Sequence, residues 1–298
     1  MMDLRNSFHP YAMVTIIFWS LAYVLTRLTL QHFSAFSLGF LRYFLASCTL
    51  IAVAGVIKIA LPRKKDALWF LASGGVGFFF YMIAFNQGQA AVSSATASVV
   101  IATVPVITAL LARVLFRESL QTVQWMAIFV EFSGVAVLTL TDGTFSVNAG
   151  LLWLLAAAVG LSVYNLLQRQ LTKTYTGMQT AAFSIYAGTL MLAMFAPQAA
   201  RELVQAPPMQ YCYLAVLGIG SSAVAYVAWT MAFARAKQTS QVSNYMFVTP
   251  FLASLFGFLL AGEVPDRATI IGGSIILIGM MMFNFGGKFC RSCQDQKR

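Results

Sequence analysis

Long apolar runs alternate with short polar segments along the whole chain. A helix of about 20 apolar residues crosses the roughly 30 Å hydrocarbon core of a bilayer. Ten runs reach about that length with few charged residues in them, so the pattern predicts ten membrane-spanning helices. The first run is about as long as a membrane-spanning helix, so it is expected to remain in the protein as a span. The predicted spans cover residues 11–30, 36–60, 67–86, 94–115, 122–140, 149–168, 178–197, 210–232, 241–261 and 268–287.

The composition agrees with helices that face lipid. Hydrophobic residues make up 59% of the 298 residues and charged residues only 9%, whereas soluble domains carry about 25% charged residues. So few charges cannot cover a water-exposed surface of this size, and the apolar surface is expected to face lipid. The connections are short, so no soluble domain is inserted between the spans. We therefore predict an all-α integral membrane protein.

The basic residues indicate how the chain is threaded through the membrane. The net charge is +10, but lysine and arginine occur in short clusters between apolar runs, so nucleic acid is not an expected partner. With the N-terminus inside, 15 of the 19 basic residues fall in inside segments and four, Arg27, Arg42, Arg201 and Arg267, fall outside. Cytoplasmic loops carry such an excess of Lys and Arg. Both termini are therefore predicted to be cytoplasmic, in a plasma or inner cell membrane.

The two halves of the chain repeat one another. A shift of 145 residues places Pro105 on Pro250, each within an apolar run, and Glu118 on Glu263, each just past that run. Identity between the halves is low, and the weight of the match comes from rare residue types at equivalent positions. The same shift also pairs Gly75 with Gly220, Tyr81 with Tyr226, and Gly134 with Gly279.

Five spans in each half imply that the halves are inverted. Because five is an odd number, the second half must run through the membrane upside down relative to the first. Inverted repeats of this kind are typical of secondary transporters. We predict two five-helix repeats and a cytoplasmic tail, over residues 1–144, 145–287 and 288–298.

Four segments carry a resemblance to a known family. They are FWSLAYVLTR (18–27), FLRYF (40–44), AAVSSATASVVIATVPVITALLARVLFRES (90–119) and AKQTSQVSNYMFVTPFLASLFGFLLAGEVP (236–265). The chain resembles the EamA family of the drug/metabolite transporter superfamily in both halves and over nearly its whole length. The resemblance implies a ten-helix exporter of amino acids, other metabolites or drugs. It also implies a site between the halves, lined mainly by the first, third, fourth, sixth, eighth and ninth helices.

Polar and aromatic residues within the predicted spans are candidates for the lining of that site. Trp19 and Tyr23 lie four residues apart, so they share one face of a helix. Flat apolar walls with few charges suit a small zwitterionic or neutral aromatic solute. The alternative is that these residues are interfacial aromatics and hydrogen-bonding groups between helices. The candidates are Trp19, Tyr23, Tyr81, Asn86, Ser98, Thr103, Tyr164, Asn165, Gln168, Tyr226, Trp229, Ser243, Asn244 and Thr249.

Two prolines within apolar runs are candidate hinges. A proline inside a helix removes a backbone hydrogen bond and kinks the helix. Pro105 and Pro250 occupy equivalent positions in the two halves, which favours a pair of hinges beside the site. The alternative is a packing kink without a role in gating.

Four charged residues lie near or within the predicted spans, and two of them, Glu131 and Arg42, have two possible roles each. Glu131 stands in the fifth predicted helix, where the family would have an apolar or small residue; it is a candidate for proton coupling or for a hydrogen bond between helices. Arg42 is a candidate contact for a substrate carboxylate, or it extends toward the outer headgroups. Glu118 and Glu263 are expected to be turn residues that bond to loop backbone or to neighbouring arginines.

The patterns favour a secondary transporter that works by alternating access and exports amino acids or similar small metabolites. A multidrug or toxic-compound efflux carrier is the alternative. An intramembrane enzyme would need a catalytic set at membrane depth, and the two histidines, His9 and His32, lie near membrane boundaries. A scaffold or channel fits the helices but does not require an inverted duplication.

No cofactor is expected for this chain. A GxxxxGK phosphate-binding loop is absent from the sequence. Cys290 and Cys293 form a single CxxC, which is half of a zinc site at best. The expected partners are a small-molecule substrate and the lipid bilayer. Substrate identity, transport direction, coupling ion, and monomer or homodimer are left open by the sequence.

Overall fold

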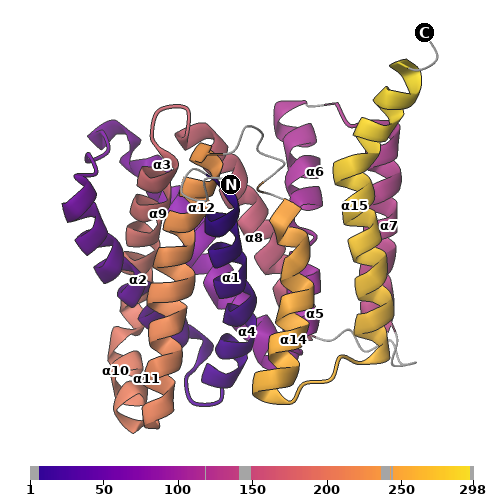
Figure 1. Cartoon of the computed structure of the whole chain (residues 1–298). Helices are drawn as coiled ribbons and strands as arrows, with labels where there is room; N and C mark the ends of the chain where they lie inside the picture. Colours follow the sequence, from indigo (N-terminus) through magenta and orange to yellow (C-terminus); the bar gives the residue numbers. More distant parts are fainter. Residues whose placement is uncertain (1–6, 118, 141–148, 236–241, 243, 296–298) are drawn as a thin grey trace.

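The computed structural model describes residues 7–117, 119–140, 149–235, 242 and 244–295, and this part of the chain contains no β-strand (Figure 1). The first half contains α1 (His9–Thr29), α2 (Ala35–Ile57), η1 (Lys64–Asp66), α3 (Ala67–Gly74), η2 (Gly75–Phe80), α4 (Tyr81–Ala91), α5 (Ser94–Ile101), α6 (Val104–Phe116) and α7 (Thr122–Leu140). The second half contains α8 (Ala149–Leu171), α9 (Gly177–Leu192), η3 (Ala193–Phe195), α10 (Ala196–Gln205), α11 (Pro208–Ala215), η4 (Val216–Val224), α12 (Ala225–Arg235), η5 (Asn244–Val248), α14 (Thr249–Ala261) and α15 (Arg267–Asp295).

Seven helices in the described part of the chain are long and apolar enough to cross a membrane. They run over His9–Thr29, Ala35–Val56, Lys64–Ala91, Ser94–Phe116, Ala149–Leu171, Gly177–Gln205 and Pro208–Ala232. Three shorter apolar helices cover Thr122–Leu138, Thr249–Ala261 and Arg267–Phe283. The fold is therefore an all-helical membrane protein, whereas the count of ten spans stays a prediction.

Two predicted boundaries differ in the structure. The predicted ninth span, 241–261, is broken within the described residues, because the 3₁₀ turn η5 precedes α14. At the other boundary, α15 continues to Asp295, so residues 288–295 of the predicted tail are helical. The side chains of Cys290 and Cys293 lie outside the described residues.

Pro105 and Pro250 stand in the first turn of a helix rather than in its middle. α5 ends at Ile101 and α6 begins at Val104, so Pro105 is the second residue of α6. Pro250 is likewise the second residue of α14, directly after η5. A proline is tolerated at this place because the first N–H groups of a helix have no intrahelical partner. The predicted kinks are thus breaks between two helices, at equivalent positions in the two halves.

Two π-helical segments also occupy equivalent positions. η2 lies between α3 and α4, and η4 lies between α11 and α12. π-Turns are rare, and they occur often at functional sites because they rotate the side chains that follow. Gly77 allows η2 to approach α8 closely, because a Cβ there would lie 2.2 Å from Cδ2 of Tyr164.

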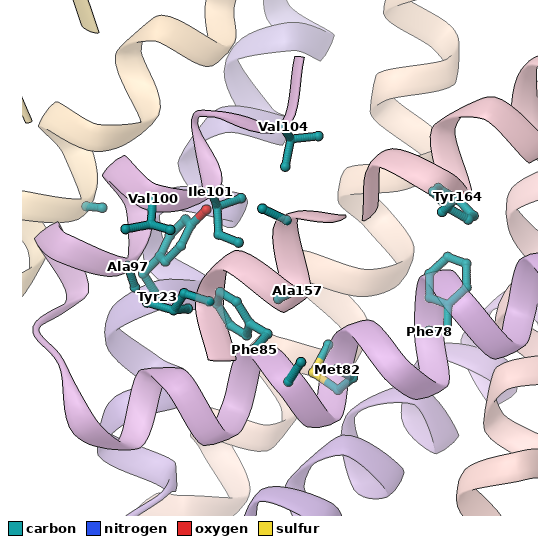
Figure 2. Close-up of a cluster of buried hydrophobic side chains, with 14 of the residues drawn as sticks. Tyr23, Phe78, Met82, Phe85, Ala97, Val100, Ile101, Val104, Ala157 and Tyr164 are labelled. Carbon is teal, nitrogen blue, oxygen red and sulfur yellow. The ribbon is translucent and has the colours of Figure 1, made fainter. Parts of the chain in front are cut away.

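Aromatic and aliphatic side chains from α1, η2, α4, α5 and α8 form the core (Figure 2). Tyr23 and Phe85 meet edge to face with ring centroids 5.6 Å apart, and Phe78 meets Tyr164 at 5.1 Å. Such pairs add stability beyond the area they bury, because the ring edge of one faces the negative face of the other. The core therefore fixes the two tyrosines relative to each other.

α7 and α15 lie side by side at one edge of the molecule (Figure 1). A Cβ on Gly134 would lie 2.7 Å from the carbonyl oxygen of Gly272. Small residues let two membrane helices approach closely and gain van der Waals contact. The beginning of α1 and the end of α15 lie at the same end of the bundle (Figure 1).

Candidate functional site

A cavity of about 410 Å³ lies at the centre of the helices. α1, α2, α4, α5, α6, α8, α9, α12, α14 and α15 all contribute residues to its wall, so both halves of the chain form it. The wall includes Arg42, Pro105 and Pro250. It also includes ten of the predicted lining residues: Trp19, Tyr23, Tyr81, Ser98, Tyr164, Asn165, Gln168, Tyr226, Trp229 and Thr249.

Two of the predicted lining residues, Asn86 and Thr103, are not among the residues that border the cavity. Asn86 is fully buried, and its Nδ2 donates a hydrogen bond of 2.8 Å to the carbonyl oxygen of Ala35. The Thr103 hydroxyl donates to the carbonyl oxygen of Val100 at 2.7 Å, and the Thr103 backbone N–H donates to the same oxygen at 3.1 Å. Both side chains satisfy backbone groups in an apolar environment. Ser243 lies outside the described residues, as does the side chain of Asn244.

Three aromatic residues form one wall of the cavity. Trp19 on α1 faces Tyr226 and Trp229 on α12, with ring centroids 5.6 Å and 5.1 Å apart. The Trp19 Nε1 donates to the carbonyl oxygen of Ser221 at 3.2 Å, which satisfies the indole N–H and orients the ring. This wall can stack against a flat or unsaturated apolar group.

Arg42 brings a positive charge into the cavity. Its side chain lies two turns into α2 and is only 8% exposed. The Nε donates to Oγ of Ser222 at 2.8 Å, and the guanidinium lies 5.9 Å from the ring centroid of Tyr43. Ser222 and Tyr43 are not among the residues predicted for the site. A tyrosine beside an arginine within an apolar run is the signal that could have pointed to Tyr43.

One end of the cavity reaches exposed residues. Thr172 and Gly177, at the connection between α8 and α9, border the cavity and are exposed. The connection between α2 and α3 lies against them, because the Tyr175 hydroxyl donates to Asp66 at 2.6 Å and accepts from the Arg63 N–H. The cavity therefore opens at the end of the molecule that carries these two connections.

An ion pair joins three segments at the opposite end of the helices. The Arg27 Nε lies 2.9 Å from Oε1 of Glu263. Oε2 of Glu263 accepts the Ser94 backbone N–H at 2.8 Å, and the Arg27 Nη1 donates to the carbonyl oxygen of Val92. These contacts join the end of α1, the start of α5 and the segment between α14 and α15.

These contacts test the expectation that Glu263 bonds to a neighbouring arginine or to loop backbone. It accepts a backbone N–H, as expected, but that group belongs to Ser94 at the start of α5. Its described ion-pair partner is Arg27, from the other half of the chain, and not Arg267. Glu118 lies outside the described residues.

Glu131 lies at the contact between α7 and α15 and is not among the residues that border the cavity. It is 1% exposed, and neither carboxyl oxygen has a hydrogen-bond partner among the described residues. A Cβ on Gly279 would lie 2.5 Å from Cγ of Glu131. No group of three or more His, Cys, Asp or Glu side chains that could hold a metal ion occurs in the described part of the chain.

The sequence matches known transporters along most of its length. The sequence model of the EamA-like transporter family matches residues 7–140 and again residues 148–285. A probable terminal-alkyne amino-acid exporter of Streptantibioticus cattleyicolor is 30% identical over 271 residues, which cover 91% of each chain. An S-adenosylmethionine uptake transporter of Rickettsia prowazekii is 22% identical, over 96% of this chain and 95% of that protein.

The fold is shared with a protein of known crystal structure. That protein is 20% identical, and the superposition covers 91% of this chain and 94% of that chain with a TM-score of 0.62.

Proposed function

The chain belongs to the EamA-like transporter family, and from this we propose that it exports amino acids or similar small metabolites by alternating access. The observation that carries the proposal is the central cavity, which both halves form and one end of which reaches exposed residues. In this proposal the pair of Arg27 and Glu263 closes the other end. A cavity of about 410 Å³ is of the size that holds a small solute. The similarity to a probable terminal-alkyne amino-acid exporter supports amino acids as the substrate class.

Alternating access requires two halves that exchange conformations, and we propose two inverted five-helix repeats. Three pairs of features support this proposal. The family model matches each half, Pro105 and Pro250 each follow a break between helices, and η2 and η4 place a π-helix in each half. The breaks beside the two prolines act as hinges in this proposal, because they border the cavity and interrupt the helical hydrogen bonds.

The proposed direction of transport follows from the charge of the loops. The open end of the cavity carries the connections between α2 and α3 and between α8 and α9, which hold Arg63, Lys64, Lys65 and Lys173. Clusters of this kind face the cytoplasm. The open end is therefore assigned to the cytoplasm, from which an exporter collects its substrate.

Solute counterflow in proteoliposomes tests the proposal. Vesicles that contain the purified protein are loaded with one unlabelled amino acid, and uptake of its labelled form is measured with and without a pH gradient. The panel includes a terminal-alkyne amino acid, and protein-free vesicles are the control. We expect saturable exchange of at least one amino acid. Exchange of lipophilic cations alone would favour a drug-efflux carrier, and no exchange of any solute would reject the transport function.

A further inference from the structure

Arg42 is a buried cation that forms no ion pair with a carboxylate in the described part of the chain. A charged side chain within the membrane is costly unless it is paired or faces water or a ligand. Arg42 is 8% exposed, and no aspartate or glutamate among the described residues lies within ion-pair distance of it. One N–H of its guanidinium, on Nε, is bound to Ser222. The terminal nitrogens remain available to the cavity that the side chain borders.

The contacts of Arg42 hold the guanidinium in place. Ser222 is fully buried in η4, so its hydroxyl is a fixed acceptor for the Nε at 2.8 Å. The ring of Tyr43 also lies beside the guanidinium, with 5.9 Å between Cζ of Arg42 and the ring centroid. A guanidinium offers its remaining N–H groups as a planar fork, which matches the two oxygens of a carboxylate. An arginine that is already oriented loses less side-chain entropy when it binds an anion.

The described wall of the cavity contains no negative charge. Arg42 is the single charged residue among those that border it. In an apolar cavity, a charge acts more strongly than it does in water. A solute ammonium would therefore meet only neutral oxygens and aromatic faces, whereas a solute carboxylate would meet a charged fork.

We infer that the cavity selects its substrates by their carboxylate, which binds Arg42, and does not require an ammonium group. The apolar part of the solute then lies against the wall of Trp19, Tyr226 and Trp229. The substrate class is a carboxylate with a flat or unsaturated apolar side chain, with or without an α-amino group. This inference rests on the proposed function, because it concerns the same cavity.

Three related probes separate the two charges of an amino acid. L-Phenylalanine carries both charges, 3-phenylpropanoate carries only the carboxylate, and phenethylamine carries only the ammonium. Binding to the purified protein is followed by the change in tryptophan fluorescence, with excitation at a wavelength that the phenyl ring does not absorb. Of the five tryptophans, Trp19 and Trp229 border the cavity and are expected to give this change. We expect the two carboxylates to bind with similar affinity. Phenethylamine is expected to bind at least about tenfold more weakly, because a hydrogen-bonded charge contributes that much.

Variants of Arg42 test whether this residue supplies the selectivity. Arg42→Gln is expected to weaken binding of both carboxylates at least about tenfold and to leave phenethylamine binding unchanged or stronger. Arg42→Lys keeps the charge without the fork, so a partial recovery of affinity is expected. Arg201→Gln is the matched control, since Arg201 is exposed on α10. Thermal unfolding of each variant shows that it is folded.

Several results would overturn the inference. They are equal binding of phenethylamine, binding of phenylalanine but not of 3-phenylpropanoate, absence of binding by all three probes, or an Arg42→Gln variant that binds carboxylates normally. Counterflow of the same probes distinguishes this failure from failure of the proposed function. Saturable exchange that does not depend on the carboxylate would support the transport function and contradict the inference about Arg42. Binding that depends on Arg42, without any exchange, would support the inference about Arg42 and contradict the transport function.

Discussion

At the scale of single residues, one ion pair links segments from the two halves of the chain. Arg27 and Glu263 are far apart in sequence, yet they form the ion pair that joins α1, α5 and the segment after α14. Exposed ion pairs contribute little to stability, and Arg27 is 36% exposed while Glu263 is 12% exposed. A weak pair of this kind can close one end of a cavity and still open during each transport cycle.

Glu263→Gln removes the charge that holds Arg27 and is expected to open this end of the cavity. The Ser94 N–H can still bond to the amide oxygen, so the change acts mainly on the ion pair. A cysteine placed at Ser98, which borders the cavity, reports the opening through a membrane-impermeant thiol reagent added from outside the cell. Cys48 and Cys212, which are free thiols, are first replaced by serine. We expect faster labelling in Glu263→Gln.

Arg267→Gln is the control for this experiment, because Arg267 is a neighbouring charge that does not pair with Glu263 in the described contacts. Its labelling rate should equal that of the parent. Equal rates in all three proteins would mean that the ion pair does not close the cavity.

At the scale of elements, the contact between α7 and α15 buries a carboxyl group within the membrane-spanning part of the protein. Glu131 is buried against Gly279 without a described hydrogen-bond partner. An ionised carboxylate in lipid costs at least about 2.5 kcal/mol, so the neutral form is expected at this position. The contact lies away from the lining of the cavity, which favours a packing role over proton coupling.

Two substitutions in this pair separate packing from coupling. Gly279→Leu forces α7 and α15 apart and is expected to lower stability by about 1–3 kcal/mol, as overpacking does. Glu131→Gln keeps the size of the side chain, so transport and its dependence on a pH gradient are expected to persist. Thermal unfolding measures the first effect and vesicle transport the second. Loss of pH-driven transport in Glu131→Gln, in a folded protein, would establish the coupling role instead.

At the scale of the whole molecule, both halves of the chain contribute to the wall of one cavity. The beginning of α1 and the end of α15 lie at the same end of the bundle (Figure 1). Arg42 from the first half bonds to Ser222 from the second half inside the membrane-spanning region. Because the cavity wall and the ion pair of Arg27 with Glu263 both use residues from the two halves, neither half alone contains them.

The orientation of the chain can be tested by labelling both termini. Single cysteines are placed before α1 and after α15 in an otherwise cysteine-free protein. Because basic residues face the cytoplasm, we expect an impermeant reagent to label neither one in intact cells and both after permeabilisation. Labelling of one terminus alone in intact cells would contradict an even number of spans, and with it the two inverted repeats.

Much of the fold could be predicted from the sequence, because the length and apolarity of a segment are enough to define a membrane helix. The predicted starts of the first two spans, 11 and 36, lie close to His9 and Ala35 in the structure. The equivalence of Pro105 and Pro250 also follows from the sequence, since it needs only a constant shift. Ten of the candidate residues border the cavity because polar groups within a span seldom face lipid.

Only the tertiary structure decided which way the remaining side chains point. Asn86 and Thr103 turn to backbone carbonyls, and Glu263 reaches Arg27 rather than its neighbour. Helix rotation sets these directions, and the π-segments and the break before α6 change that rotation within one span. Hydropathy determines that a segment crosses the membrane. The rotation of that segment depends on packing between residues far apart in the chain, which no single segment encodes.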